Sequence, residues 1–408
     1  MIAENDSELN QWLEMLRSPE LSDRLVAVKN LQYLGDEEAT NALLLALSDQ
    51  SIAVQKIAIS ALWEIGNPVA IPAFIDCLGS ADVDIRQEAL SALNEWLEML
   101  RSPELSDRLV AVKNLQYLGD EEATNALLLA LSDESMAVQK IAISALWEIG
   151  NPVAIPAFIE CLGSADADIR QEALSALNEL VSPTDLRQLL DALHRDNVNI
   201  QLNILTLLRK IHDAQSLPDI LPFFASDVPE LRATAVTTLS YLNQVEKCPQ
   251  ALALISDEDL NVRRATALSL GHLTDPEVIS ILCQALKSDT DWQVRRNAAK
   301  SLAIHADCAA ILALETAVSD EHWQVRKFAL QALQKIPDER VMPALIKALA
   351  DEYSDVRKEA AIALGNLSNP AAMPALQQSL DDPDKEVTIF SQKAIQKIQT
   401  LLQNSQNG

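Results

Sequence analysis

Apolar and small residues recur along the chain in one fixed register. An apolar residue precedes an anchor slot, usually Arg or Gln, and small residues follow at +3 and +6, with Leu at +7 and an apolar residue at +10. The segment from Val325 to Ile336 is a clear case. Offsets −1, +3, +7 and +10 lie on one face of a helix. Each segment therefore predicts an amphipathic helix with one buried face.

The anchor slot occurs thirteen times. Successive anchors are 31 residues apart, except for one spacing of 32 and one of 22. The +7 slot holds Leu or Ile in all thirteen units. A fixed period of this length indicates a repeat architecture. The anchors stand at positions 24, 55, 86, 108, 139, 170, 201, 232, 263, 295, 326, 357 and 388.

A second apolar stretch lies upstream of each anchor, for example Pro343–Leu349. A proline fits the first turn of a helix, where its missing N–H would have no partner. The same slot holds Pro72, Pro156, Pro222 and Pro374. A polar turn such as 256–259 separates the two stretches and can cap the second helix. Each unit is a helical hairpin that buries both apolar faces only when it is stacked, so we expect an all-α solenoid.

The pattern Asp-x-x-x-x-Val-Arg-x-x-Ala-x-x-Ala-Leu resembles HEAT repeats of the short bacterial type over essentially the whole chain. Within that superfamily, Asp291–Arg295 and His322–Arg326 are similar to cyanobacterial phycobilin-lyase-like HEAT proteins. That group attaches bilins to phycobiliproteins. It also includes relatives that only bind partners, one of which engages an A-type iron–sulfur carrier. The resemblance therefore implies either a lyase or isomerase subunit or a binding protein.

The sequence also contains a longer repeat that spans several hairpins. Residues 12–95 recur as 96–179, and the two copies differ at four of 84 positions. The differences are Gln50/Glu134, Ile52/Met136, Asp76/Glu160 and Val83/Ala167. Divergence between HEAT units ordinarily leaves only the pattern of core residues in common. Two copies this similar therefore indicate a duplication that is recent or engineered. Engineering is favoured because the joint is tidy: Leu93–Trp96 overlays Leu9–Trp12.

The joint also explains the short anchor spacing. From Asp84 to Arg101 there is no Gly or Pro, and apolar residues keep helical phase. We predict one helix of about 18 residues that serves two units, ended by Ser102-Pro103, with a break in the superhelix. The chain then divides into an N-terminal block 1–95, a duplicated block 96–179 and a C-terminal solenoid 180–408. Self-association through the duplicated block is an open alternative, because either copy could dock on the downstream array.

Composition narrows the class of function. The 408 residues include 59 acidic and 32 basic side chains, a net charge of −27. This charge argues against binding nucleic acid or an anionic membrane. The N-terminus lacks the features of a signal peptide, and no apolar run reaches the roughly 20 residues needed to span a bilayer. The five widely spaced cysteines form no disulfide framework. We expect a cytoplasmic protein.

A row of cations follows the anchors in the C-terminal half. Arg264, Arg296, Lys327 and Lys358 occupy the +1 slot of four successive units. Two interpretations stay open: a solvated helix face, or a groove for carboxylates or an acidic partner. The anchor arginines themselves come with an Asp five or six positions earlier, and we interpret these pairs as a structural charge ladder within and between repeats.

Aromatic residues stand beside this row. Trp292 and Trp323 occupy the −3 slot of adjacent units, and Tyr353 lies one position earlier in the next. Because other units place Ile or Val at −3, core packing at the helix start is one interpretation. The other is a ledge for a partner or, under the lyase resemblance, for a bilin.

Residues typical of catalytic and metal sites do not converge. None of the five histidines is followed by Glu, as in the iron-ligating pairs of deoxyhypusine hydroxylases, and there is no CxxC. His305 falls in a +10 core slot, where a hydrogen-bonded core histidine is expected. The sequence shows no phosphate loop or nucleophile elbow. We therefore assign no catalytic residue, no metal and no cofactor, apart from a bilin if the lyase interpretation holds.

The favoured interpretation is a non-catalytic scaffold that binds a protein partner on its concave face, lined by second helices. The predicted contact surface is the basic row together with Trp292, Trp323 and Tyr353. A phycobilin lyase or isomerase subunit is the alternative, and a partner of an A-type iron–sulfur carrier is a further one. Whether the chain is an enzyme stays open, with a non-enzyme favoured.

Overall fold

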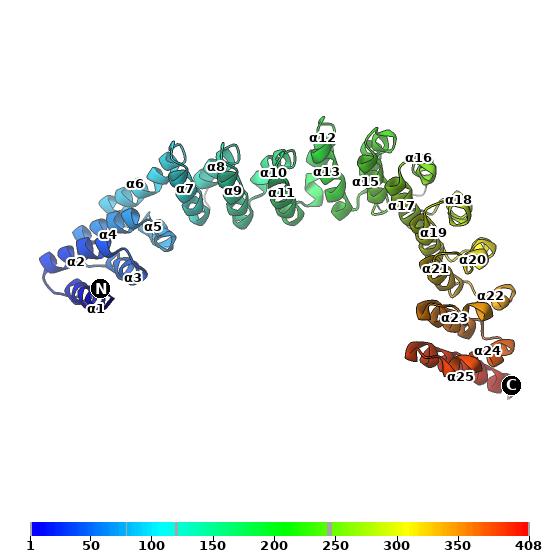
Figure 1. The fold of residues 1–408 in the computed structure, drawn as a ribbon. Coiled ribbons are helices and arrows are strands. Elements are labelled where there is room, and N and C mark those ends of the chain that lie inside the picture. The colour runs from blue at the N-terminus through cyan, green and yellow to red at the C-terminus, as the bar shows by residue number, and fades with distance from the viewer. Residues whose placement is uncertain (1, 79, 119–120, 243–246, 407–408) are drawn as a thin grey trace. The chain divides into compact units, whose positions relative to one another are not determined.

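The computed structural model describes residues 2–78, 80–118, 121–242 and 247–406, and these residues form helices joined by turns (Figure 1). By its internal contacts the chain divides into two compact units, Met1–Val181 and Ser182–Gly408. We call them unit 1 and unit 2. The predicted all-α solenoid is confirmed. The predicted division into three parts stays a prediction, and its first boundary lies inside a helix.

Every anchor slot lies on a helix of its own, which we call the second helix of its hairpin. The second helices are α2 (Leu21–Leu34), α4 (Ile52–Ile65), α6 (Val83–Met99), α7 (Leu105–Leu118), α9 (Met136–Ile149), α11 (Ala167–Leu180), α13 (Val198–Ile211), α15 (Pro229–Leu239), α17 (Leu260–Ser269), α19 (Trp292–His305), α21 (Trp323–Leu333), α23 (Ser354–Leu367) and α25 (Lys385–Gln406).

Most first helices are shorter than the second helices, with α1 and α18 as exceptions, and many continue from a 3₁₀ turn. They are α1 (Ile2–Leu16), α3 (Glu37–Ala46), α5 (Ile71–Leu78), α8 (Glu121–Ala130), α10 (Ile155–Cys161), α12 (Leu186–Leu193), α14 (Leu217–Ile220), α16 (Pro249–Ala253), α18 (Glu277–Ser288), α20 (Ile311–Ala317), α22 (Met342–Ala348) and α24 (Met373–Gln378). Pro156, Pro343 and Pro374 begin their helices as predicted, whereas Pro222 lies in a 3₁₀ turn.

The +7 slots form the core of the stack. Twelve of the thirteen Leu or Ile side chains in this slot are buried, from Leu31 to Ile395, and the thirteenth, Leu93, lies outside the described side chains. Truncating one such side chain to Ala typically costs about 2–5 kcal/mol. Hydrophobic burial between neighbours is therefore what holds the repeats in register.

Polar turns begin the second helices as the sequence predicts. Asp259 accepts hydrogen bonds from the backbone N–H groups of Asn261 and Val262. Asp82, Asp166 and Asp291 cap α6, α11 and α19 in the same way. These carboxylates satisfy N–H groups that have no partner inside the helix.

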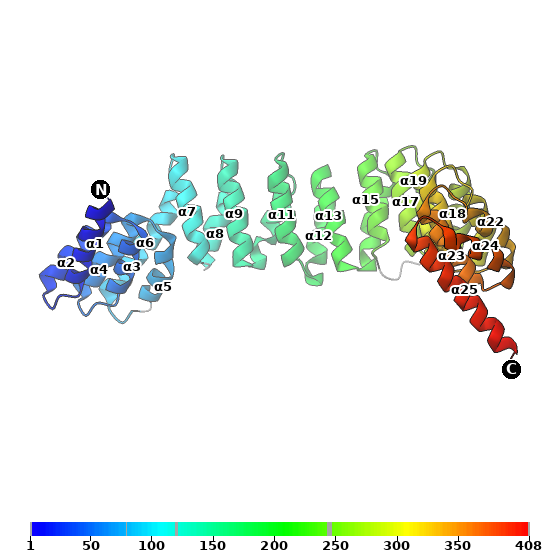
Figure 2. The same cartoon turned by 60° about the horizontal axis from the view of Figure 1, so that its bottom comes forward.

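The predicted shared helix is confirmed as α6, with 17 residues and no interruption at the joint. It packs against α4 and α5, which precede it in the chain, and against α7, which follows it. Trp96 is buried there, with its ring 4.8 Å from the ring of Trp63 and 6.0 Å from that of Phe74. In Figure 2, α7, α9 and α11 stand side by side, whereas α2 and α4 run obliquely to them. This change of direction within unit 1 agrees with the predicted break.

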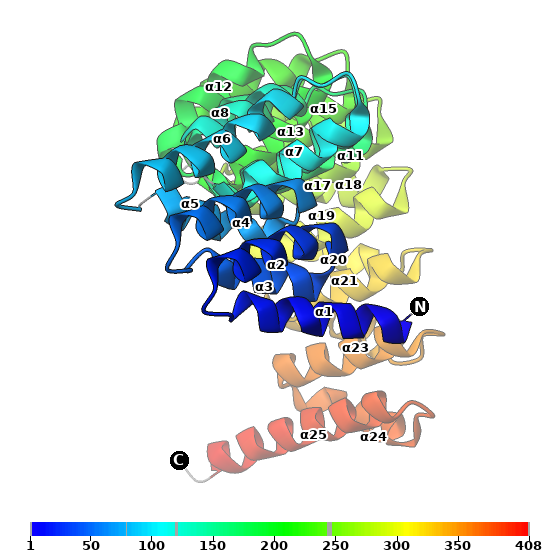
Figure 3. The same cartoon turned by 90° about the vertical axis from the view of Figure 1, so that its left-hand side faces the viewer.

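The two kinds of helix lie on opposite sides of unit 2. The second helices α13 to α25 line its inner, concave side, and the first helices α12 to α24 form its outer side (Figure 1). At the other end of the chain, α1 lies alongside α2 and α3 (Figure 3). Among the helices of the described residues, none combines the length and apolarity that crossing a membrane requires.

Candidate functional site

A ladder of ion pairs runs through the inter-helix turns. The guanidinium of Arg295 is bidentate on Asp320, at 2.7 and 3.0 Å, and also donates to the backbone carbonyl of Asp289 at 3.0 Å. In the same way Arg357 binds Asp382 and thereby lowers the pKa of that carboxyl. The predicted ladder is confirmed, and its rungs are Arg24–Asp49, Arg108–Asp133, Arg232–Asp257, Arg263–Asp289, Arg295–Asp320, Arg326–Asp351 and Arg357–Asp382.

Two anchor arginines lack such a carboxylate among the described residues. Arg86 donates to the carbonyl of Ser80, and Arg170 to that of Ser164. The position 25 residues after Arg86 is Ala111, inside α7, because the shared helix removes one connector. The ladder is therefore a structural device that follows the repeat spacing.

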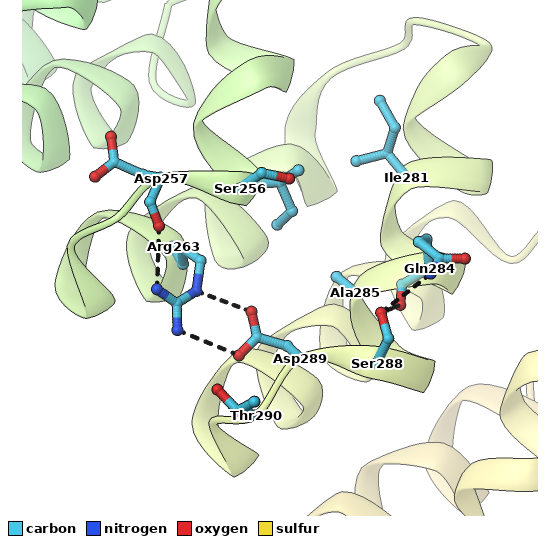
Figure 4. Close-up of a pocket in the computed structure, with 10 residues that line it drawn as sticks. Ser256, Asp257, Arg263, Ile281, Gln284, Ala285, Ser288, Asp289 and Thr290 are labelled. Carbon is cyan, nitrogen blue, oxygen red and sulfur yellow. Dashed lines mark hydrogen bonds and ion pairs between the residues drawn. The ribbon is translucent and has the colours of Figure 1, made fainter.

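A pocket lies along this ladder beside Arg263. Its volume is about 530 Å³, and it opens between the turn before α17 and the helix α18, where the anchor spacing is 32 (Figure 4). Arg263 reaches across it to Asp289 at 2.9 Å and to the carbonyl of Asp257 at 3.0 Å. Because these donors are already engaged, the pocket supplies no free charge for a ligand.

The predicted basic row lies on the concave face of unit 2, and three of its four cations are paired. Arg264 is bidentate on Asp291, at 2.8 and 2.9 Å. Lys327 lies 2.7 Å from Asp355. These bonds lower the pKa of both carboxyl groups. Lys358 binds Glu386 at 2.9 Å, which raises the pKa of the lysine. These three cations therefore pair with carboxylates of the next repeat, and both interpretations of the row stay predictions.

Arg296 is the exception in this row. Its Nε and Nη2 donate to the side-chain oxygen of Asn297, at 3.2 and 3.0 Å, and its guanidinium lies 5.4 Å from the ring centre of Trp292. No carboxylate of the described residues lies within ion-pair distance of it. Arg296 therefore keeps its positive charge without a compensating anion.

The predicted aromatic residues form two stacked pairs across neighbouring repeats. Trp292 stacks on His322, with ring centres 3.8 Å apart and planes 7° apart. Trp323 stacks on Tyr353 at 5.2 Å and 12°. Lys327 and Arg326 lie 5.9 and 5.8 Å over Trp323 and Tyr353, respectively. We call these four rings the aromatic ledge.

The −3 slot is a surface position. Ile52, Val83 and Val198 are 45%, 66% and 41% exposed, so the interpretation of this slot as core is wrong. Each begins a second helix, where the side chain lies outside the +3/+7 face that is buried between repeats. Trp292 and Trp323 are half-buried in the same slot, because each stacks on a ring of the next repeat.

Sequence reasoning missed Lys300 and Phe328, which belong to the same surface. The exposed Lys300 lies one turn beyond Arg296 on α19, and its Nζ is 5.5 Å from the ring centre of Phe328 on α21. The sequence signal that could have identified Lys300 is its position five residues after the anchor, which lies on the same helix face as the −3 and +1 slots. Trp292, Arg296 and Lys300 therefore follow one another along one face of α19.

The remaining candidates carry no reactive chemistry. His305 shares the expected hydrogen bond, with the carbonyl of Leu270 at 2.9 Å, but its side chain is half-buried and lies outside the core. Burial raises the pKa of the Cys161 thiol to about 11 and also raises that of Cys283, so neither is an activated thiolate. In the described part of the chain, no group of three or more His, Cys, Asp or Glu residues could hold a metal ion.

The repeat geometry agrees with the comparison with known families. The HEAT-repeat family matches residues 9–94, 93–178, 220–303 and 311–396. The chain is a HEAT-repeat protein. Comparison of this HEAT-repeat protein with curated proteins gives no match. The first two matched segments correspond closely to the two copies of the duplication.

Solved structures with similar folds are long solenoids. Kap95p in complex with RanGDP is 14% identical with a TM-score of 0.53, and the match covers 96% of the HEAT-repeat protein and 61% of Kap95p. Kap95 in the Kap95:Nup1 complex is 14% identical with a TM-score of 0.55, and the match covers 98% of the HEAT-repeat protein and 62% of Kap95. Kap121p bound to Nup53p is 16% identical with a TM-score of 0.53, and the match covers 97% of the HEAT-repeat protein and 49% of Kap121p. The chain thus spans less than two thirds of these proteins, and the likeness concerns the fold alone.

Proposed function

We propose that this HEAT-repeat protein is a non-catalytic scaffold that binds a protein partner on the concave face of unit 2. The observation that carries the proposal is the aromatic ledge: two tryptophans in a surface slot, each stacked on the next repeat and beside a cation. Half-exposed aromatic residues flanked by arginine are the usual anchors of protein interfaces. The similar folds of Kap95p and Kap121p occur in complexes with Nup1 and Nup53p.

The proposal is tested by selecting peptides on the full chain from a phage-displayed library of random dodecapeptides. Selected peptides are assayed on the wild type and on the double variant Trp292→Ala/Trp323→Ala. The double variant Ile52→Ala/Met136→Ala changes the same slot in unit 1 and is the matched control. We expect binding to fall about tenfold or more in the tryptophan variant and to stay within about twofold in the control. Peptides that bind both variants equally well would contradict the proposal.

A phycobilin lyase subunit is the second candidate, favoured by the same pairing of rings and cations. The ledge offers flat apolar faces for a tetrapyrrole, and Arg296 offers a partner for a propionate. Mixing the protein with phycocyanobilin tests this function. A red-shifted and enhanced absorbance that Trp323→Ala abolishes is expected for a lyase, whereas an unchanged spectrum supports the scaffold.

We also propose that the duplication of residues 12–95 is engineered and provides a route to self-association. Its support is the near identity of the copies and the shared helix that joins them. Light scattering of the full chain and of a chain lacking residues 12–95 tests this route. We expect a concentration-dependent oligomer for the full chain only, and equal masses per chain would contradict it.

A further inference from the structure

Cations in the +1 slot follow one pairing rule within each unit. Each described pair joins the +1 cation of one repeat to a carboxylate near the start of the next second helix. The acceptor stands either two residues before the next anchor or at the helix cap. The pairs are Lys56–Asp84 at 3.7 Å, Lys140–Asp168 at 2.7 Å, Arg264–Asp291 at 2.8 Å, Lys327–Asp355 at 2.7 Å and Lys358–Glu386 at 2.9 Å.

Arg296 breaks this rule because neither acceptor position opposite it holds a carboxylate. The cap of α21 is His322, where α19 has Asp291. The position two residues before the anchor is Gln324, where α23 has Asp355. Arg296 therefore occupies the +1 slot like the other cations, but the next repeat offers it no carboxylate.

The two residues opposite Arg296 each have one unsatisfied polar atom. Among the described side chains, His322 Nδ1 and Gln324 Oε1 are buried atoms without a hydrogen-bond partner. Buried polar atoms without partners cost free energy, and a ligand that supplies the partners recovers it. Arg296 lies over the ring of Trp292, which stacks on His322, and Gln324 follows two residues later in the first turn of α21.

The missing groups define the chemistry of an occupant. Arg296 needs a carboxylate, and the exposed Lys300, one turn along the same face, can take a second about 5–6 Å away. Gln324 Oε1 is an acceptor and needs an N–H donor. A peptide with acidic side chains supplies both kinds of group, whereas a simple anion supplies no N–H. Trp292 and Trp323 flank the position and favour apolar side chains next to the acidic ones.

We propose that the rung between Arg296 and Gln324 is completed by an acidic peptide segment of the partner. This inference rests on the proposed function and names the chemistry of its ligand. One carboxylate of the segment binds Arg296, and a second binds Lys300. The internal pair Lys358–Glu386 shows the geometry that the partner reproduces from outside.

The test supplies the missing carboxylate from the protein itself. Gln324→Glu places a carboxylate where Asp355 and Glu386 stand in the next two repeats, so it should neutralise Arg296 and exclude the peptide. Arg296→Gln removes the cation. Gln293→Glu adds the same charge one repeat earlier, where Arg264 already binds Asp291, and serves as the control. The probe is the fluorescein-labelled dodecapeptide that the phage selection enriches most, and its Kd is measured by anisotropy.

We expect the enriched peptides to carry two or more Asp or Glu residues. Both Gln324→Glu and Arg296→Gln should weaken binding about tenfold or more, and Gln293→Glu less than about threefold. Peptides that depend on Trp292 and Trp323 but lack acidic residues would overturn this inference and leave the scaffold in place. An unchanged Kd in both rung variants would do the same. If no peptide depends on the two tryptophans, the proposed function itself fails.

Discussion

The two copies in unit 1 share 80 of 84 residues, yet one tryptophan has different partners in each. In the first copy, the ring of Trp63 lies 4.8 Å from the buried ring of Trp96. In the second copy, the same residue is Trp147, and its Nε1 donates to Glu179 at 2.8 Å. Glu179 corresponds to Glu95, which is exposed. The contacts of a side chain at the end of a repeat therefore depend on the residues of the segment that follows.

The difference arises where the copies end. Helix α11 stops at Leu180, and its cap Val181 has an extended ψ of 134°. Ser182-Pro183 follows, and a proline disfavours helical backbone in the residue before it. The counterpart of Pro183 is Met99, a good helix former, so α6 continues to its end at Met99. The repeat sequence specifies its hairpin, and the residues after it decide how hairpins are joined.

Replacing Trp96 by Ala should have the largest effect, because its buried ring holds α6 against α4 and α5. We expect a loss of about 3–5 kcal/mol for the hairpins around α6. The same residue in the first copy, Trp12, is only half-buried at the end of the stack, and Trp12→Ala should cost less than half as much. Hydrogen exchange of α4 to α7 in the two full-length variants measures the difference. Equal losses would contradict the role of the shared helix.

A proline at position 99 should make the first copy end like the second. Met99→Pro disfavours helical backbone at Glu98 and clashes with the carbonyl of Glu95. We expect α6 to end near Trp96, at a cost of about 3 kcal/mol. Faster amide exchange from Leu97 onward is the measurement, and Met99→Ala is the control that keeps the helix. The interpretation fails if Met99→Pro exchanges like the control.

An acid titration should distinguish the copies at the turn before their third anchor. The backbone N–H of Ile169 and, less strongly, Lys140 lower the pKa of Asp166 below 3.8. The ionised carboxylate therefore favours folding above pH 3.8, and this contribution is lost as the pH falls through the lower folded-state pKa. Lys140→Gln should raise the pKa of Asp166 part of the way toward 3.8, as measured by NMR. Lys56→Gln, the same change in the other copy, should leave it unchanged.

Much of the fold follows from residue spacing. The +7 leucines predict thirteen second helices, and the absence of Gly or Pro between Asp84 and Arg101 predicts α6. The Arg–Asp ladder also follows, because both residues recur with the period of the repeat. Periodicity within a helix assigns a residue to a face. It identifies neither the atoms that the next repeat presents to that face nor the exposure of a slot at the helix start.

The candidate site shows this limit. The sequence identifies Arg264, Arg296 and Lys327 as equivalent, and only the contacts between repeats separate the unpaired Arg296 from its paired neighbours. Once the two acceptor positions, the helix cap and the residue two before the next anchor, are known, His322 and Gln324 become informative. The −3 slot was misinterpreted for a related reason: an apolar residue at a helix start is compatible with both core and surface.

The smallest expected effect concerns a substitution that separates the copies at their ladder. Arg108 binds Asp133 as Arg24 binds Asp49, and its Nη2 also lies 3.1 Å from Glu134, which is Gln50 in the first copy. Because the Glu134 side chain is 84% exposed, solvent screens this additional pair, and Glu134→Gln should cost less than about 1 kcal/mol. Urea denaturation of the full chain measures the change.

The reverse exchange makes this prediction sharper. Gln50→Glu should give Arg24 the second carboxylate that Arg108 already has, and should stabilise the first copy by the amount that Glu134→Gln removes from the second. If only the buried rung matters, both changes are close to zero, whereas Arg108→Gln leaves Asp133 without its partner and costs several kcal/mol. A large effect of Glu134→Gln would mean that the exposed carboxylate, and not the buried one, determines how this turn is held.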